Sequence, residues 1–120
     1  RADFVSVHCP LDQSTYGLID RWAFERMKRG VFLINCARGP IVDRAALLEA
    51  LAAGKVTGIG IDTHWQEPWD PQDPLLKDPR VVALPHIGGS TDETFRALAD
   101  LVADNLERLR TGAPLRNRVV

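Results

Sequence analysis

Short apolar runs alternate along the chain with segments that have helical spacing, and this alternation restricts the folds open to it. The runs have the length and the β-rich composition of buried strands. They cover Phe4–Val7, Val31–Ile34, Gly58–Ile61 and Val81–Leu84. Strands that alternate with helices connect through right-handed crossovers and form a parallel sheet. The alternation therefore predicts an α/β fold of the doubly wound type, with helices on both faces of the sheet.

Polar residues suited to helix ends flank the first two helical segments. Asp20 and Asp43 are placed to cap the starts of these helices, because a carboxylate accepts hydrogen bonds from the free backbone N–H groups there. Gly30 and Gly54 follow the two segments and are placed to end them, since glycine adopts the left-handed conformation at little cost. We therefore expect one helix between the first two strands and another between the second and third.

A longer helix is expected after the fourth strand. Ser90 and Glu93 match a capping box, and apolar residues follow at steps of three or four until Thr111–Gly112. One face of this helix should pack on the sheet. The segment Trp65–Pro79 holds four of the eight prolines, which exclude a regular helix and predict an ordered surface loop. We expect one domain over residues 1–112 and a tail over residues 113–120.

The composition argues against several kinds of partner. The 15 basic and 16 acidic residues give a formal charge of -1 without long blocks of one sign, so we expect no nucleic-acid partner. No apolar run approaches the roughly 20 residues of a membrane span, and the first residues lack a secretory pattern, which favours the cytoplasm. We expect Cys9 and Cys36 to be free thiols, and the absence of paired metal-ligand spacing predicts no metal site.

Polar residues gather where the predicted strands end, and ligands bind at this edge of open α/β sheets. Arg38 follows the second strand, Glu67 lies shortly after the third, and His86 follows the fourth. An arginine can hold a carboxylate through two parallel hydrogen bonds and polarise a neighbouring carbonyl. A histidine exchanges protons near neutral pH, and a neighbouring glutamate would orient its ring. The set predicts proton transfer on an anionic substrate in one shared crevice.

Three motifs closely resemble those of the D-isomer-specific 2-hydroxyacid dehydrogenases. They are Phe4-Val5-Ser6-Val7-His8-Cys9-Pro10-Leu11, Leu33-Ile34-Asn35-Cys36-Ala37-Arg38-Gly39-Pro40-Ile41-Val42-Asp43 and Pro85-His86-Ile87-Gly88-Gly89. The resemblance runs nearly end to end. It implies a parallel-sheet, Rossmann-like half domain with flanking helices, corresponding to the C-terminal part of an NAD-binding domain over residues 1–112. The tail 113–120 would lead toward a substrate domain.

The resemblance also implies a role for each site residue. Arg38 would bind the substrate carboxylate and carbonyl, His86 would be the acid/base, and Glu67 would support His86. Asp62, five residues before Glu67, would contact the nicotinamide, and a glutamate rather than a glutamine favours a hydroxyacid enzyme over the related formate dehydrogenases. The implied cofactor is NAD, with NADP left open. Its further contacts would be Pro10, Cys36, Ala37, Gly88 and Gly89.

The sequence departs from the family pattern in two places. Residues 63–66 read Thr-His-Trp-Gln, where many members have an aliphatic, an aromatic and an acidic residue, so the particular hydroxyacid stays open. No Gly-x-Gly-x-x-Gly motif with a following acidic residue occurs, so the usual pyrophosphate loop is missing. We expect a fragment or truncated product that by itself turns over negligibly and binds NAD weakly.

Two other functions remain open beside a dehydrogenase acting on a small 2-oxo or 2-hydroxy acid. The family also includes NAD-sensing corepressors, which work through protein contacts. A non-catalytic remnant that oligomerises is the other alternative, because an exposed sheet edge favours association. For the dehydrogenase we expect a homo-oligomer.

Overall fold

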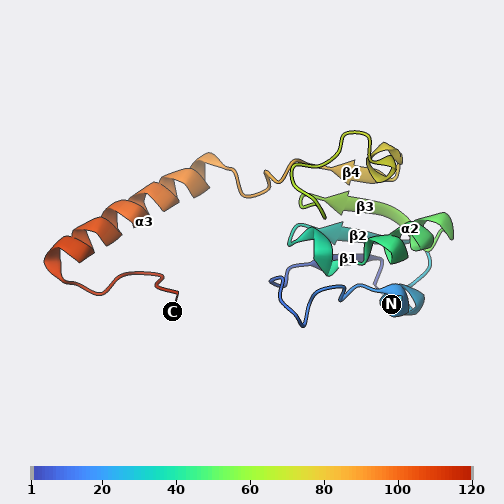
Figure 1. The fold of residues 1–120 in the computed structure, drawn as a ribbon, viewed down its shortest axis with the longest axis horizontal. Coiled ribbons are helices and arrows are strands. Elements are labelled where there is room, and N and C mark those ends of the chain that lie inside the picture. The colour runs from blue at the N-terminus through green and yellow to red at the C-terminus, as the bar shows by residue number, and fades with distance from the viewer. Residues whose placement is uncertain (1, 120) are drawn as a thin grey trace. The chain divides into compact units, whose positions relative to one another are not determined.

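The computed structural model describes residues 2–119, which divide into two compact units, one ending at Ile87 and one beginning at Gly88. The first unit contains a four-stranded parallel sheet in the order β1-β2-β3-β4 (Figure 1). Its strands are β1 (Phe4–Val7), β2 (Val31–Asn35), β3 (Val56–Ile61) and β4 (Val81–Ala83). All four predicted strands are confirmed, and the sheet with its flanking helices is Rossmann-like, as expected.

Two α-helices and two short 3-10 helices connect the strands of this unit. They are α1 (Arg21–Arg26), η1 (Gly39–Ile41), α2 (Arg44–Ala52) and η2 (Pro74–Lys77). Asp20 and Asp43 cap α1 and α2 as predicted, by accepting hydrogen bonds from backbone N–H groups three residues later. Helix α1 ends at Arg26, earlier than expected, and Gly30 with a φ of 83° lies directly before β2 instead.

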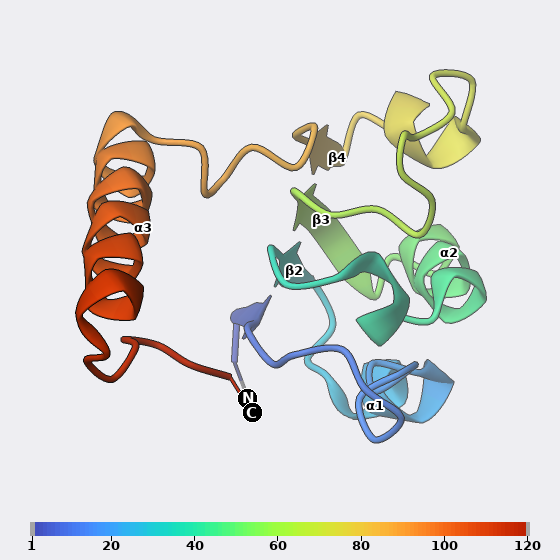
Figure 2. The same ribbon diagram turned by 60° about the vertical axis from the view of Figure 1, so that its left-hand side comes forward.

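The helices α1 and α2 lie on the same face of the sheet (Figure 2). Fully buried residues of β2, β3 and α2, including Leu33, Val56 and Leu47, form the core between them. Burying a side chain of this size contributes about 1.5–3 kcal/mol relative to leaving it exposed. The opposite face carries the exposed, stacked rings of Phe4 and Phe32. Within this unit, the expectation of helices on both faces is therefore met on one face.

The second unit contains the long helix α3 (Asp92–Thr111). Gly112 ends it in the left-handed conformation, with a φ of 71°, as predicted. The predicted cap at Ser90 is wrong, because Thr91 is the N-cap residue and its side chain accepts a hydrogen bond from the Thr94 N–H. The two hydroxyl residues are adjacent, so the apolar spacing of the helix fits either of them. The packing of α3 on the sheet stays a prediction.

Candidate active site

The turn after β2 is shaped by the side chain of Asn35, which is fully buried. Its Nδ2 donates a hydrogen bond to the carbonyl oxygen of Arg38 at 2.9 Å, and its Oδ1 accepts one from the Ala37 N–H at 3.1 Å. A buried amide satisfied in this way fixes the backbone around it. The turn leaves Arg38 exposed, with one Nη1 hydrogen bond to the Ala37 carbonyl at 2.6 Å. Asn35 therefore sets the position from which Arg38 can reach a ligand.

The ends of β1 and β2 form one cavity of about 640 Å³. Its lining consists of His8, Cys9, Pro10, Leu11, Cys36, Ala37 and Arg38. Three of these residues, Pro10, Cys36 and Ala37, were predicted to contact the cofactor. The same lining contains Arg38, which was predicted to bind the substrate. Both cysteines are free. An open cavity whose walls combine apolar side chains with polar groups, and which has an arginine at its side, suits a flat ring beside an anionic group.

His86 and Glu67 meet although they follow different strands. The Nδ1 atom of His86 lies 2.8 Å from Oε2 of Glu67, and the His64 N–H donates a hydrogen bond to Oε1 of Glu67 at 2.9 Å. These two hydrogen bonds hold the pKa of Glu67 below its ordinary value. The bond from the His64 N–H has the larger effect and that with His86 the second largest, while burial opposes them with a smaller effect. Glu67 is therefore a carboxylate near neutral pH, and an acceptor of this kind requires the hydrogen on Nδ1 of His86. The Nε2 atom remains for proton exchange.

The backbone of His86 is strained, with a φ of 56° in the left-handed region that side-chain-bearing residues rarely adopt. Such a conformation costs on the order of 1–3 kcal/mol and persists where surrounding contacts enforce it. The next residue supplies one such contact, since the Ile87 N–H donates to Oδ1 of Asp62 at 2.9 Å. Asp62 is 4% exposed and stands at the end of β3. It thus anchors the His86 segment, a structural role that the sequence did not reveal.

The Glu67–His86 pair lines a smaller cavity of about 140 Å³ together with His64, Pro68, Trp69 and Pro85. Arg38 lines the larger cavity described above. The structure thus brings Glu67 and His86 together as predicted and places Arg38 with Pro10, Cys36 and Ala37. The convergence of both groups on one substrate stays a prediction. Gly88 and Gly89 begin the second compact unit, and their contact with a cofactor stays a prediction as well.

Sequence reasoning missed the loop residues that surround this pair. The ring Nε2 of His64 lies 2.9 Å from the carbonyl oxygen of Leu84, and the indole Nε1 of Trp65 donates to the carbonyl of Val42 at 2.7 Å. A Cβ on the buried Gly39 would lie 2.2 Å from the backbone carbonyl carbon of His64. Gly39 is therefore required for the close approach of the two loops. A glycine that follows a strand end was the available signal.

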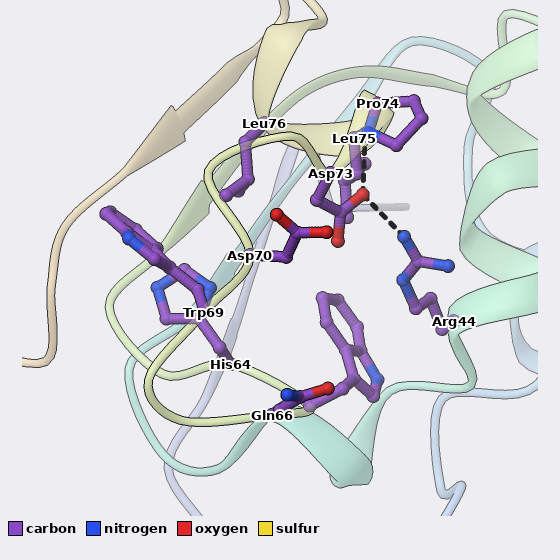
Figure 3. Close-up of a pocket in the computed structure, with 10 residues that line it drawn as sticks. Arg44, His64, Gln66, Trp69, Asp70, Asp73, Pro74, Leu75 and Leu76 are labelled. Atoms are coloured by element: carbon purple, nitrogen blue, oxygen red, sulfur yellow. Dashed lines mark hydrogen bonds and ion pairs between the residues drawn. The ribbon is translucent and has the colours of Figure 1, made fainter.

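A third cavity of about 430 Å³ shares His64 and Trp69 with the smaller cavity (Figure 3). Arg44 forms an ion pair with Asp73 at its wall, with 2.6 Å between Nη2 and Oδ1. The same carboxylate oxygen accepts a hydrogen bond from the Leu75 N–H and so caps η2. The sequence did not predict this cavity, since its walls come from α2 and from the proline-rich loop, which meet only in the folded chain.

The described residues also bear on the predicted metal and membrane partners. Within residues 2–119, no group of three or more His, Cys, Asp or Glu side chains is arranged to hold a metal ion. In the same part of the chain, no helix combines the length and the apolar character that crossing a bilayer requires.

Comparison with known proteins identifies relatives along the whole chain. D-3-phosphoglycerate dehydrogenase of Archaeoglobus fulgidus is 44% identical over 118 residues, which cover 98% of this chain and 22% of that protein. Glyoxylate reductase of Korarchaeum cryptofilum is 44% identical over 111 residues, covering 92% of this chain and 33% of the relative. The chain therefore spans about a fifth to a third of the length of these relatives.

Solved structures of similar fold include complexes with both forms of the nicotinamide cofactor. A D-isomer specific 2-hydroxyacid dehydrogenase of Lactobacillus delbrueckii ssp. bulgaricus in its NAD-complexed form matches with a TM-score of 0.88 and 34% identity, covering 98% of this chain and 40% of that one. A Xanthobacter autotrophicus Py2 enzyme in complex with NADPH and MES matches with a TM-score of 0.84 and 33% identity, covering 99% and 48%.

A family model shows where the chain belongs. The model described as D-isomer specific 2-hydroxyacid dehydrogenase, NAD binding domain, matches residues 1–88, which include Arg38, Glu67 and His86. The match ends within one residue of the boundary between the two compact units. This chain belongs to the NAD-dependent D-isomer-specific 2-hydroxyacid dehydrogenase family and carries part of the NAD-binding domain of such an enzyme.

Proposed function

We propose that the chain supplies the proton-transfer and substrate-binding groups for hydride transfer between NAD(P)H and a 2-oxo acid, giving a D-2-hydroxy acid. The observation that carries this proposal is the 2.8 Å contact between His86 Nδ1 and Glu67 Oε2. The contact fixes the imidazole ring and leaves Nε2 as the atom that exchanges a proton with substrate. Carboxylate-oriented histidines act in this way as general acids and bases.

His86 then serves both directions of the reaction. During reduction, Nε2 of the protonated ring gives its proton to the carbonyl oxygen, and the Glu67 carboxylate stabilises the cation before transfer. During oxidation, neutral His86 takes the proton from the hydroxyl group. Because the pKa of Glu67 is held low, the glutamate stays ionised throughout and does not compete for the proton.

Arg38 is the proposed substrate anchor. Its exposed guanidinium can bind the carboxylate of a 2-oxo acid with two hydrogen bonds and orient the carbonyl group toward His86. The buried Asn35 holds the turn that carries it, so the anchor starts from a fixed backbone position. The substrate class is a small 2-oxo or 2-hydroxy acid.

The cofactor site is proposed to begin in the 640 Å³ cavity, where the apolar side chains of Pro10, Leu11 and Ala37 offer a surface for a nicotinamide ring. Pro10, Cys36, Ala37 and Asp62 would hold the nicotinamide end, and the backbone of Gly88 and Gly89 is proposed as a further cofactor contact. A bound nicotinamide dinucleotide supplies or accepts the hydride.

We propose that the NAD-binding domain includes residues 1–112 and that the tail 113–120 leads to a substrate domain. We also propose that the enzyme is a cytoplasmic homo-oligomer.

The direct test uses the complete gene product and follows NADH or NADPH oxidation with glyoxylate, hydroxypyruvate and pyruvate. Arg38→Gln should lower kcat/KM on the order of 100-fold or more, because the carboxylate loses a bidentate partner. Arg96→Gln, which removes an exposed arginine of α3, serves as the matched control and should stay within about twofold of the parent. Turnover that survives Arg38→Gln unchanged contradicts the proposal.

A further inference from the structure

His64 joins the loop that carries Glu67 to the segment that carries His86. Its backbone N–H donates a hydrogen bond to Glu67 Oε1 at 2.9 Å. Its ring Nε2 lies 2.9 Å from the carbonyl oxygen of Leu84, two residues before His86. A carbonyl oxygen only accepts, so Nε2 of His64 carries the hydrogen and donates it. His64 therefore contacts Glu67 directly. It also contacts Leu84, which belongs to the segment that carries His86.

This hydrogen bond bridges a region that the sheet does not control. The ladder between β3 and β4 ends with the pair Ile61 and Ala83, followed by a hydrogen bond from the Leu84 N–H to the Ile61 carbonyl at 2.8 Å. Beyond this point the two chain segments leave the regular sheet. The contact between His64 and Leu84 lies between the end of the ladder and the pair of Glu67 and His86. It fixes the spacing of the two segments where backbone pairing has stopped.

The ring of His64 is itself held in one orientation. The indole of Trp69 contacts it edge to face, with ring centroids 4.3 Å apart, and Figure 3 shows the two rings side by side at the cavity wall. The backbone of His64 rests against Gly39, where a side chain would clash. The neighbouring Trp65 donates to the Val42 carbonyl. These contacts fix the loop against the turn that follows Arg38, so the His64 ring is held in a defined position relative to the backbone.

We propose that His64 is a positioning residue that sets the geometry of Glu67 and His86 through its ring hydrogen bond to Leu84. The role rests on the proposed function, in which Glu67 and His86 perform proton transfer. The positioning role requires an N–H donor at the far end of a side chain that also packs against Trp69. Phenylalanine supplies the packing without the donor, and glutamine supplies a donor of similar reach. Asparagine is polar but too short to reach Leu84.

The test compares His64→Phe, His64→Asn and His64→Gln by two measurements. The first is an NMR titration of the Glu67 side-chain carboxyl in the 120-residue chain. In the Phe and Asn variants the contact with His86 loosens, so the pKa of Glu67 should rise part of the way toward its ordinary value, because the backbone N–H of residue 64 still donates to Oε1. The Gln variant should keep the low value. Circular dichroism and the urea midpoint verify that each variant is folded.

The second measurement is kcat and KM of the complete gene product with a 2-oxo acid. The Phe and Asn variants should lose roughly tenfold in kcat with KM nearly unchanged, since a displaced catalytic group costs rate more than binding. The acidic limb of their pH profile should move to higher pH, and Gln should restore both. An unchanged Glu67 pKa in the Phe and Asn variants overturns the positioning role. If the parent reduces no 2-oxo acid, the proposed function fails, while the NMR titration still decides the role of His64.

Discussion

Glu67 and His86 stand 19 residues apart in the sequence and follow different strands, yet Oε2 of Glu67 lies 2.8 Å from Nδ1 of His86. Parallel strands bring their carboxyl ends to one edge of a sheet, which explains why the pair can form there. The loop around His64 then completes the contact beyond the sheet.

Replacing Glu67 by glutamine should lower kcat of the complete gene product on the order of 100-fold. The amide keeps the size of the side chain but removes the negative charge that orients and stabilises the protonated His86 ring. Glu25→Gln, a change on the exposed face of α1, is the matched control and should leave kcat unchanged. Initial-rate kinetics with a 2-oxo acid and NADH measure both. Equal rates for the two variants would exclude a role for the Glu67 charge.

Replacing Asn35 by alanine should destabilise the first compact unit by about 1–3 kcal/mol, because the Ala37 N–H and the Arg38 carbonyl lose their buried partner. The loosened turn should also raise KM for the 2-oxo acid. Urea unfolding followed by circular dichroism measures the stability. Ser6→Ala, which removes an exposed polar group from the neighbouring strand, is the control. A stability equal to that of the parent would show that Asn35 does not hold the turn.

Replacing Gly39 by alanine should cost about 1–3 kcal/mol of stability, since the new Cβ would overlap the backbone of His64. The loop must move away, so the contact of Glu67 with His86 should weaken as well. Gly60→Ala makes only ordinary contacts, 3.9 Å from the Ile34 side chain, and serves as the control. The urea midpoints of the two variants provide the comparison. Similar midpoints would contradict the close approach at Gly39.

Asp78 should contribute stability that disappears in acid. Hydrogen bonds from Arg80 hold the pKa of Asp78 at about 2, below its ordinary value of 3.8. A carboxyl whose pKa is lowered by folding stabilises the fold above the ordinary value and loses that contribution as the pH falls toward the lowered one. Between about pH 4 and pH 2, the parent should therefore lose more stability than Asp78→Asn. Urea midpoints across this range test the difference, and parallel curves would contradict it.

The sheet could be predicted because its signal is local. The strands β1 to β4 are short segments rich in apolar and β-branched residues, and the caps of α1 and α2 are single aspartates before helical spacing. Glu67 and His86 could be placed at one edge of the sheet because each follows a strand that the local sequence predicts. The start of α3 could not be fixed, because Ser90 and Thr91 both offer a capping hydroxyl and only the folded backbone selects Thr91.

The support of the site could not be predicted because it depends on contacts between distant segments. His64 reaches Leu84, 20 residues away, and Trp65 reaches Val42, 23 residues away. Neither contact leaves a periodic pattern in the sequence. Asp62 was interpreted only as a cofactor contact, whereas its hydrogen bond with the Ile87 N–H also holds the His86 segment.

The most direct test of the proposed acid/base role of His86 is the rate of NADH oxidation with a 2-oxo acid after His86→Gln in the complete gene product. Glutamine cannot take up or release a proton near neutral pH, so kcat should fall by about 10²–10⁴-fold. NADH binding, measured by fluorescence titration, should stay close to that of the parent, because His86 is proposed to act on the substrate oxygen. A kcat within twofold of the parent, with NADH binding intact, would contradict the assignment of His86 as the acid/base of this site.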